Sequence, residues 1–180
     1  METEFGSGVS VTGDFPETGD LSTQSGGDAI EAARKVQFSI KNVEPRITKS
    51  EQTDEMLFAK LNVRVAIGPQ GVDGNGKYAG KNLFAELLTW FNEEKYTSDW
   101  WKKQARFPYK SFLKAMGFDP AQPPKVTDDF VIGLVGREFV ADIIKSEIQV
   151  ATGNLKANGK KEYVGTGEFK NELANFKAVA

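Results

Sequence analysis

The sequence lacks two residue types on which much protein chemistry depends, because its 180 residues include no cysteine and no histidine. Disulfide scaffolds, the usual structural zinc sites and catalysis by Cys or His are therefore excluded. Apolar runs long enough to span a membrane are also missing. With 39% hydrophobic and 27% charged residues, the composition is that of a soluble protein with a real core. We expect no enzymatic activity, no cofactor, no bound metal and no membrane partner.

The charges are unevenly distributed along the chain. Residues 1–34 contain seven acidic residues and one basic residue, a net charge of −6, and this leaves +4 for residues 35–180 of the total of −2. This acidic leader is rich in Gly, Ser and Thr and has few large apolar residues, so we predict that most of it is flexible. A short helix over 28–34 is the exception that we expect. Residues 1–12 lack the features of a secretion signal, which predicts a cytoplasmic protein.

After the leader, the hydrophobic pattern changes to a period of two. Val36, Phe38 and Ile40 alternate with polar residues, as in a half-buried strand. A second strand over 57–67 has a continuous apolar face, and a Gly-rich loop separates it from a third strand over 82–90. We therefore predict three consecutive strands in the first half of residues 35–180.

The second half begins with helices and ends with strands. The pattern predicts two short helices within 100–117, separated near Pro108, and a third helix over 128–135. Two long strands over 137–150 and 162–179 follow, joined by a turn that contains Asn158–Gly159, which is typical of a hairpin. Three strands, helices and two strands are the element order of a five-stranded Greek-key barrel of the OB type. We predict a mainly β fold of this kind for residues 35–180, with a helical insertion between strands 3 and 4.

Several short stretches carry a family resemblance. In this order, Gly76–Phe84, Phe112–Gly117, Gly136–Ala141 and a closing hairpin with Glu172–Phe176 resemble the phage-encoded single-stranded DNA-binding proteins that have one OB fold. The resemblance covers about residues 35–178. It implies a protein of the bacterial host cytoplasm that coats single-stranded DNA, without sequence specificity, during phage replication or recombination. We expect the acidic leader either to recruit replication or recombination proteins or to compete with DNA.

Non-specific binding of single strands needs aromatic rings that stack on bases and cations that neutralise phosphates. One face of the second strand, the basic and aromatic block 100–110, and three loops have these residue types. We expect the loops around 46–49 and 156–163 to flank the groove, Phe112, Leu113 and Met116 to be core, and at least one of Trp100 and Trp101 to pack on the barrel. The candidate nucleic-acid-binding residues are Arg46, Lys49, Phe58, Lys60, Arg64, Lys77, Tyr78, Lys81, Trp100, Lys102, Lys103, Arg106, Tyr109, Lys156, Lys160, Lys161 and Tyr163.

Oligosaccharide binding and RNA binding by the same fold are minor alternatives, and three other functions are considered. A protein-interaction module, such as an inhibitor of a host factor, would use the same exposed aromatic residues as a contact patch. A metal-dependent nuclease would use paired carboxylates, among which we consider Asp142 the first to test. An ATPase is disfavoured, because Gly71–Tyr78 resembles a phosphate-binding loop but has Tyr78 where Ser or Thr is required, and a strand rather than a helix is predicted next.

Overall fold

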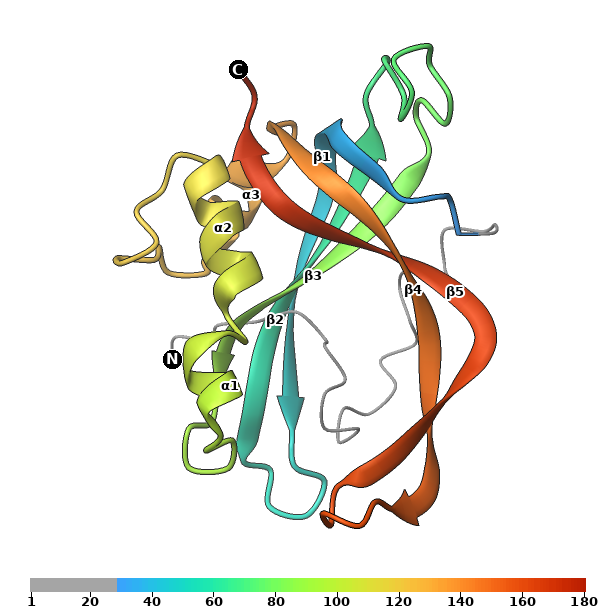
Figure 1. The fold of residues 1–180 in the computed structure, drawn as a ribbon. Helices are drawn as coiled ribbons and strands as arrows, with labels where there is room; N and C mark the ends of the chain where they lie inside the picture. Colours follow the sequence, from blue (N-terminus) through green and yellow to red (C-terminus); the bar gives the residue numbers. More distant parts are fainter. Residues whose placement is uncertain (1–28) are drawn as a thin grey trace.

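The computed structural model describes residues 29–180, and the alternating segments of the sequence form a single sheet there (Figure 1). Three helices lie between the third and fourth strands in the chain. The elements are β1 (Ala33–Lys49), β2 (Met56–Ile67), β3 (Asn82–Phe91), α1 (Asp99–Lys103), α2 (Phe107–Ala115), α3 (Asp128–Leu134), β4 (Glu138–Leu155) and β5 (Lys161–Ala178). The mainly β class that the sequence predicts is confirmed.

The strand order in the sheet is β3-β2-β1-β4-β5, and all neighbouring pairs are antiparallel. β3 and β5 are the two edge strands, so the described strands form one open five-stranded sheet, and the predicted barrel of the OB type stays a prediction. β1 has a bulge in its ladder with β2, between Ile40 and Asn42. At this bulge Lys41 is the additional residue, and such a position redirects a side chain away from the regular alternation.

The main core lies between the sheet and α2. Val36, Phe38 and Ile40 are buried as their alternation predicts, and Phe112 and Leu113 cover them from α2. Met116 is also buried in this core, as we expected. Because these residues come from separate parts of the chain, the core joins α2 to the strands of the sheet.

The helices follow local signals in the sequence. Pro108 lies at the start of α2, where a missing N–H costs nothing, and this separates α2 from α1 as predicted. At α3, the Thr127 hydroxyl accepts a hydrogen bond from the Phe130 backbone N–H at 3.2 Å. None of the helices within residues 29–180 has the length and apolar character needed to cross a membrane.

Two local predictions need correction. Residues 29–34 are not helical, because Ile30 is held in an extended position by Asn171 of β5, which accepts from its N–H at 2.9 Å and donates to its carbonyl at 2.8 Å. The hairpin turn is also shorter than predicted, because β4 and β5 continue to the pair Leu155 and Lys161. Asp28 and the rest of the acidic leader before it lie outside the described residues.

Candidate nucleic-acid interface

The face of β2 on which we predicted base stacking is largely buried. Phe58 is completely buried in a second apolar cluster with Leu88, Phe91 and Trp101. Lys60 is 1% exposed, and its Nζ lies 2.8 Å from a carboxylate oxygen of Glu86. A buried ammonium group needs such a partner, because desolvation without one is costly. The predictions that Phe58 and Lys60 contact DNA are therefore wrong for the described fold, since neither side chain is accessible.

Arg64 is the exposed member of that face, and it lies in a groove. The groove has a volume of about 640 Å³, and it is formed by the middle of β1, the end of β2, the first residues of β3 and β4, and the base of the loop over 68–81. Lys41 and Arg64 contribute two cations, and Glu138 is the one acid among the described residues that line it. The Glu138 carboxylate accepts a hydrogen bond from the Gln37 side chain at 3.1 Å. Neither Lys41 nor Arg64 forms an ion pair with another described residue.

The loop between β2 and β3, whose base lines this groove, carries an exposed aromatic ring. Tyr78 is 38% exposed, and its ring has two ammonium groups near it, Lys77 Nζ at 5.3 Å and Lys81 Nζ at 5.4 Å from the ring centroid. Two backbone hydrogen bonds, Gly80 N to Ile67 O at 2.8 Å and Ile67 N to Lys81 O at 3.0 Å, fix this turn to the end of β2. Gly68, Pro69 and Gly80 at the base of this loop line the groove, whereas Lys77, Tyr78 and Lys81 are close to it in the chain but are not among its lining residues.

The conformation of this loop is specified locally. The Asp73 carboxylate accepts hydrogen bonds from the backbone N–H groups of Asn75 at 2.9 Å and Lys77 at 3.1 Å, and these two contacts lower the pKa of Asp73. Tyr78 has a φ of 62°, in the left-handed region that a bulky residue rarely adopts. No helix follows the loop, since β3 begins at Asn82. The loop therefore lacks the helix that a phosphate-binding loop of the ATPase type requires.

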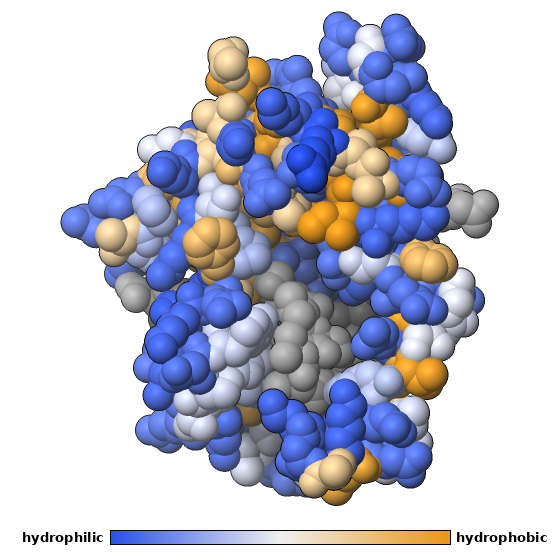
Figure 2. All heavy atoms as spheres, in the orientation of Figure 1, coloured by the Kyte–Doolittle hydropathy of each residue, from blue (hydrophilic) through white to orange (hydrophobic). Residues whose placement is uncertain are grey.

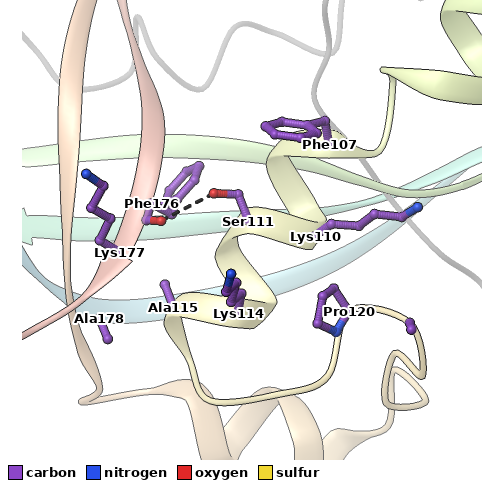
Figure 3. Close-up of a pocket in the computed structure, with 10 residues that line it drawn as sticks. Phe107, Lys110, Ser111, Lys114, Ala115, Pro120, Phe176, Lys177 and Ala178 are labelled. Atoms are coloured by element: carbon purple, nitrogen blue, oxygen red, sulfur yellow. Dashed lines mark hydrogen bonds between the residues drawn. The ribbon is translucent and has the colours of Figure 1, made fainter.

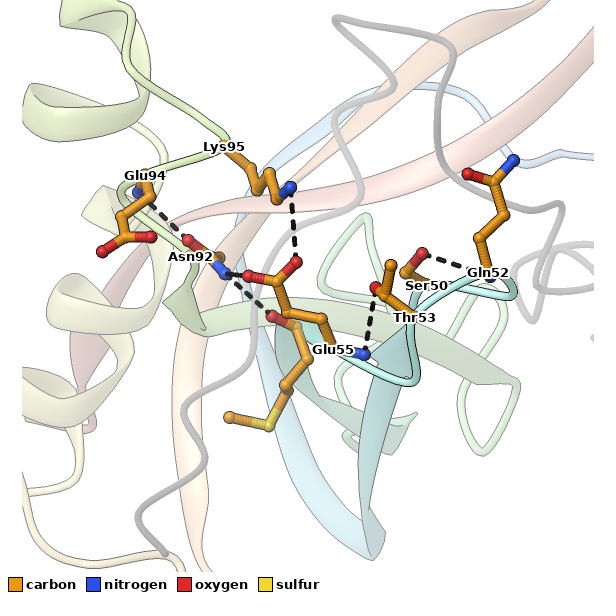
Figure 4. Close-up of polar contacts among 8 residues, drawn as sticks. Ser50, Gln52, Thr53, Glu55, Asn92, Glu94 and Lys95 are labelled. Carbon is orange, nitrogen blue, oxygen red and sulfur yellow. Dashed lines mark hydrogen bonds and ion pairs between the residues drawn. The ribbon is translucent and has the colours of Figure 1, made fainter.

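The predicted cations of the β1–β2 turn lie at the other end of the sheet, the lower end in Figure 1. Arg46 and Lys49 form ion pairs with Glu44 at 3.1 Å and with Asp54 at 3.2 Å. Figure 4 shows how the turn is connected to the end of β3: the Asn92 side chain donates to Glu55 at 3.0 Å, and Lys95 lies 3.3 Å from Glu55. These contacts fix the conformation of the turn, but nearby carboxylates neutralise the charges of Arg46 and Lys49.

The tip of the β4–β5 hairpin also lies at the lower end, as Figure 1 shows. Lys156, Lys160 and Lys161 are exposed there, and Tyr163 is half-buried. The two loops that we expected to flank a groove therefore share one end of the sheet, whereas the groove with Arg64 borders the opposite loop. Figure 2 shows mainly hydrophilic residues at the lower end and over the loop at the upper right.

The basic and aromatic block around α1 is divided between core and surface. Trp101 is 3% exposed and confirms that one of the two tryptophans packs on the sheet, while Trp100 is half-buried against it. Lys102 and Lys103 are exposed, and Lys103 pairs with Asp99 at 2.9 Å.

The remaining two candidates are Arg106, which lies 5.6 Å from the Phe91 ring, and Tyr109, which is 2% exposed. Tyr109 is a core residue, so the prediction that it contacts DNA is wrong.

Lys41 is the groove residue that the sequence analysis missed. In the sequence, Lys41 looks like any other polar residue of an alternating strand. The bulge at Lys41 depends on the pairing of β1 with β2, which the sequence does not show. A lysine beside an alternating apolar run was the only available signal. Pairing between strands, rather than the residue type, brings Lys41 and Arg64 into one groove.

The carboxylates give no metal centre in the described part of the chain, where no three Asp or Glu residues lie close enough together to hold a metal ion. Asp142, the first residue to test for a nuclease, has two structural partners. Its carboxylate accepts from the Asn175 side chain at 2.8 Å and from the Lys35 backbone N–H at 2.9 Å, and these contacts lower its pKa. Both partners have a positive φ, of 55° at Lys35 and 56° at Asn175. Asp142 therefore stabilises two unusual backbone conformations.

Asp142→Asn is expected to lower the free energy of unfolding by about 1 kcal/mol near neutral pH, because the two donors bind different oxygens of the carboxylate and an amide has only one acceptor oxygen. The pKa of Asp142 is lowered in the folded state, so its stabilising effect is present above the pKa of the unfolded chain and is lost as the pH falls through the folded pKa. Urea unfolding at several pH values should show the two proteins converging in acid. Asp54→Asn, at an exposed ion pair, is the control, and a difference that persists below about pH 2 would contradict this account.

No family model matches this chain, and no curated protein matches its sequence.

Proposed function

We propose that the protein binds single-stranded DNA without base specificity and without catalysis, and that it coats strands exposed during replication or recombination. The observation that carries the proposal is a groove that contains Lys41 and Arg64 and whose wall includes the base of the loop in which Lys77 and Lys81 lie beside the Tyr78 ring. An exposed ring can stack on any base, and cations along an extended track can neutralise successive phosphates. The groove has no recognition helix, which favours contacts with the backbone and the base faces over reading of base edges.

The fold is compatible with this proposal. OB folds are partly open five-stranded Greek-key barrels, and the order β3-β2-β1-β4-β5 supports assigning this open sheet to that class. The phage origin that the family resemblance implies is part of the same proposal. The strain of a left-handed Tyr78 is a second support, because unfavourable backbone conformations of bulky residues concentrate at functional sites.

Tyr78→Ala is expected to weaken binding of oligo-dT about tenfold, since loss of one base stack costs about 1–3 kcal/mol. Tyr78→Phe should bind as the wild type does, because it keeps the ring. Fluorescence anisotropy of labelled oligo-dT, with a duplex of equal length as competitor, measures both affinity and preference. Three tryptophans allow an independent titration by intrinsic fluorescence.

Phe169→Ala is the matched control. Phe169 is 47% exposed and has Lys145 Nζ 5.0 Å from its ring. Like Tyr78 it is an exposed ring with an ammonium group nearby, but it does not line the groove and is not on the loop whose base does. We expect its affinity to equal that of the wild type. Preference for duplex, or no binding of oligo-dT at low salt, would overturn the proposal and favour the protein-interaction module.

A further inference from the structure

An apolar pocket lies away from the groove, between α2 and the last residues of β5 (Figure 3). It has a volume of about 760 Å³, and the rings of Phe107 and Phe176 contribute to its wall, together with Ala115 and Pro120. The Ser111 hydroxyl donates to the Phe176 carbonyl at 3.3 Å, so this polar group of the wall already has a partner. Phe107 is 68% exposed, which is unusual for a large apolar residue at a concave site. The pocket is suited to an apolar side chain.

Three cations surround this apolar surface. Lys110 and Lys114 of α2 and Lys177 of β5 lie on different sides of the pocket in Figure 3, and all three are exposed. None of them forms an ion pair with another described residue, and no described acid lines the pocket. A ligand that fits these features has an apolar group between negative charges.

The acidic leader contains such a segment. In Asp14–Glu17 a phenylalanine and a proline lie between two acids, and residues 1–28 as a whole include six acids and no base. Phe15 would supply the apolar side chain, and Asp14 and Glu17 would supply charges opposite to those of the lysines. The segment Asp14–Glu17 therefore matches the pocket in both respects, since it has an apolar side chain and negative charges.

The chain between Glu17 and Ile30 is long enough for the segment Asp14–Glu17 to reach the pocket. Ile30 is fixed to Asn171 of β5, and Asn171 precedes Phe176 by five residues, a distance of about 17 Å or less along a strand. Eleven residues, 18–28, rich in Gly, Ser and Thr, separate Glu17 from the described part of the chain, and a Gly/Ser-type linker of eleven residues has an end-to-end distance of about 18 Å. When a linker's average length matches the span, the effective concentration of the tethered group is highest.

We propose that the segment Asp14–Glu17 of the acidic leader binds in the α2–β5 pocket of its own chain, with Phe15 against Phe107 and Phe176 and its acids near Lys110, Lys114 and Lys177. This contact does not depend on DNA binding. It assigns the leader a specific site on the folded part of the chain, outside the groove that we propose for DNA.

A paramagnetic label tests this contact in the full chain. Because the sequence has no cysteine, Thr12→Cys gives one attachment site near Phe15. The label is expected to broaden the backbone amide signals of Lys114, Ala115 and Ala178, and Phe15→Ala should remove the effect without altering the folded part. Reversing the three pocket lysines to Glu should remove it as well. An equal reversal at Lys102, Lys156 and Lys160, which are also exposed and form no ion pair with another described residue, is the matched control, and it should leave the broadening unchanged.

Three results would overturn the proposal. The first is broadening that Phe15→Ala does not reduce, and the second is broadening centred on Lys41 and Arg64, which would place the leader on the groove. The third comes from a mixed sample, in which the labelled protein carries no nitrogen-15 and its partner carries no label. Broadening of equal strength in that sample would show that the leader binds a second copy of the chain.

Discussion

Replacing Phe139 by alanine is expected to lower the free energy of unfolding by about 3–5 kcal/mol, the range for truncation of a buried phenylalanine. Phe139 of β4 is completely buried. Its ring stacks on Phe38 at 5.5 Å between centroids, meets Phe112 edge-on at 5.9 Å and contacts Phe176 at 5.5 Å. These partners belong to β1, α2 and β5, so one side chain joins three other elements. The alanine variant would leave a cavity at their common contact.

Urea unfolding followed by circular dichroism measures this change. Phe139→Leu keeps most of the volume and should cost less, and it provides the measurement if the alanine variant does not fold. Phe169→Ala, at an exposed ring of β5, is the control and should change stability by less than about 1 kcal/mol. A loss of less than about 1 kcal/mol for Phe139→Ala would show that the four rings do not form the centre of the core.

The sequence predicted the elements well because their signals are local. Alternation at Val36, Phe38 and Ile40 identified the buried face of β1, and Pro108 separated two helices, since both depend on a few neighbouring residues. The contacts of Phe139 with Phe38 and Phe176 join residues far apart in the chain. Pairing of this kind is determined by the whole fold, so local patterns predict the strands but do not predict whether the sheet closes.

The candidate site was predicted less well for a related reason. A period of two shows which residues share a face of a strand, but it does not show whether another layer covers that face. Phe58 and Lys60 share the face of Arg64, yet Leu88, Phe91 and Trp101 pack against Phe58 while Arg64 stays exposed. The cluster around Tyr78 was found because it lies within five residues of sequence.

Replacing Lys41, Arg64 and Lys77 together by alanine is expected to weaken binding of oligo-dT about a hundredfold near 0.1 M salt. Each cation that neutralises a phosphate of a single strand contributes about 0.7 to the slope of log affinity against log salt, so three contribute about 2. If affinity at 1 M salt is unchanged, a slope smaller by about 2 lowers affinity by about two decades at 0.1 M. All three side chains are exposed and form no ion pair with another described residue, so the substitutions should leave the fold intact.

The salt dependence separates this charge effect from the effect of the ring. Tyr78→Ala removes a stacking contact and should lower affinity with an unchanged slope, whereas the triple variant should change the slope itself. The control removes an equal number of charges at Lys102, Lys156 and Lys160, which are exposed, form no ion pair with another described residue and belong to α1 and the β4–β5 hairpin rather than to the groove or the Tyr78 loop. If the control and the triple variant reduced the slope equally, binding would depend on total charge alone. The groove beside Tyr78 would then have no special function, because non-specific attraction by any lysine would account for the affinity.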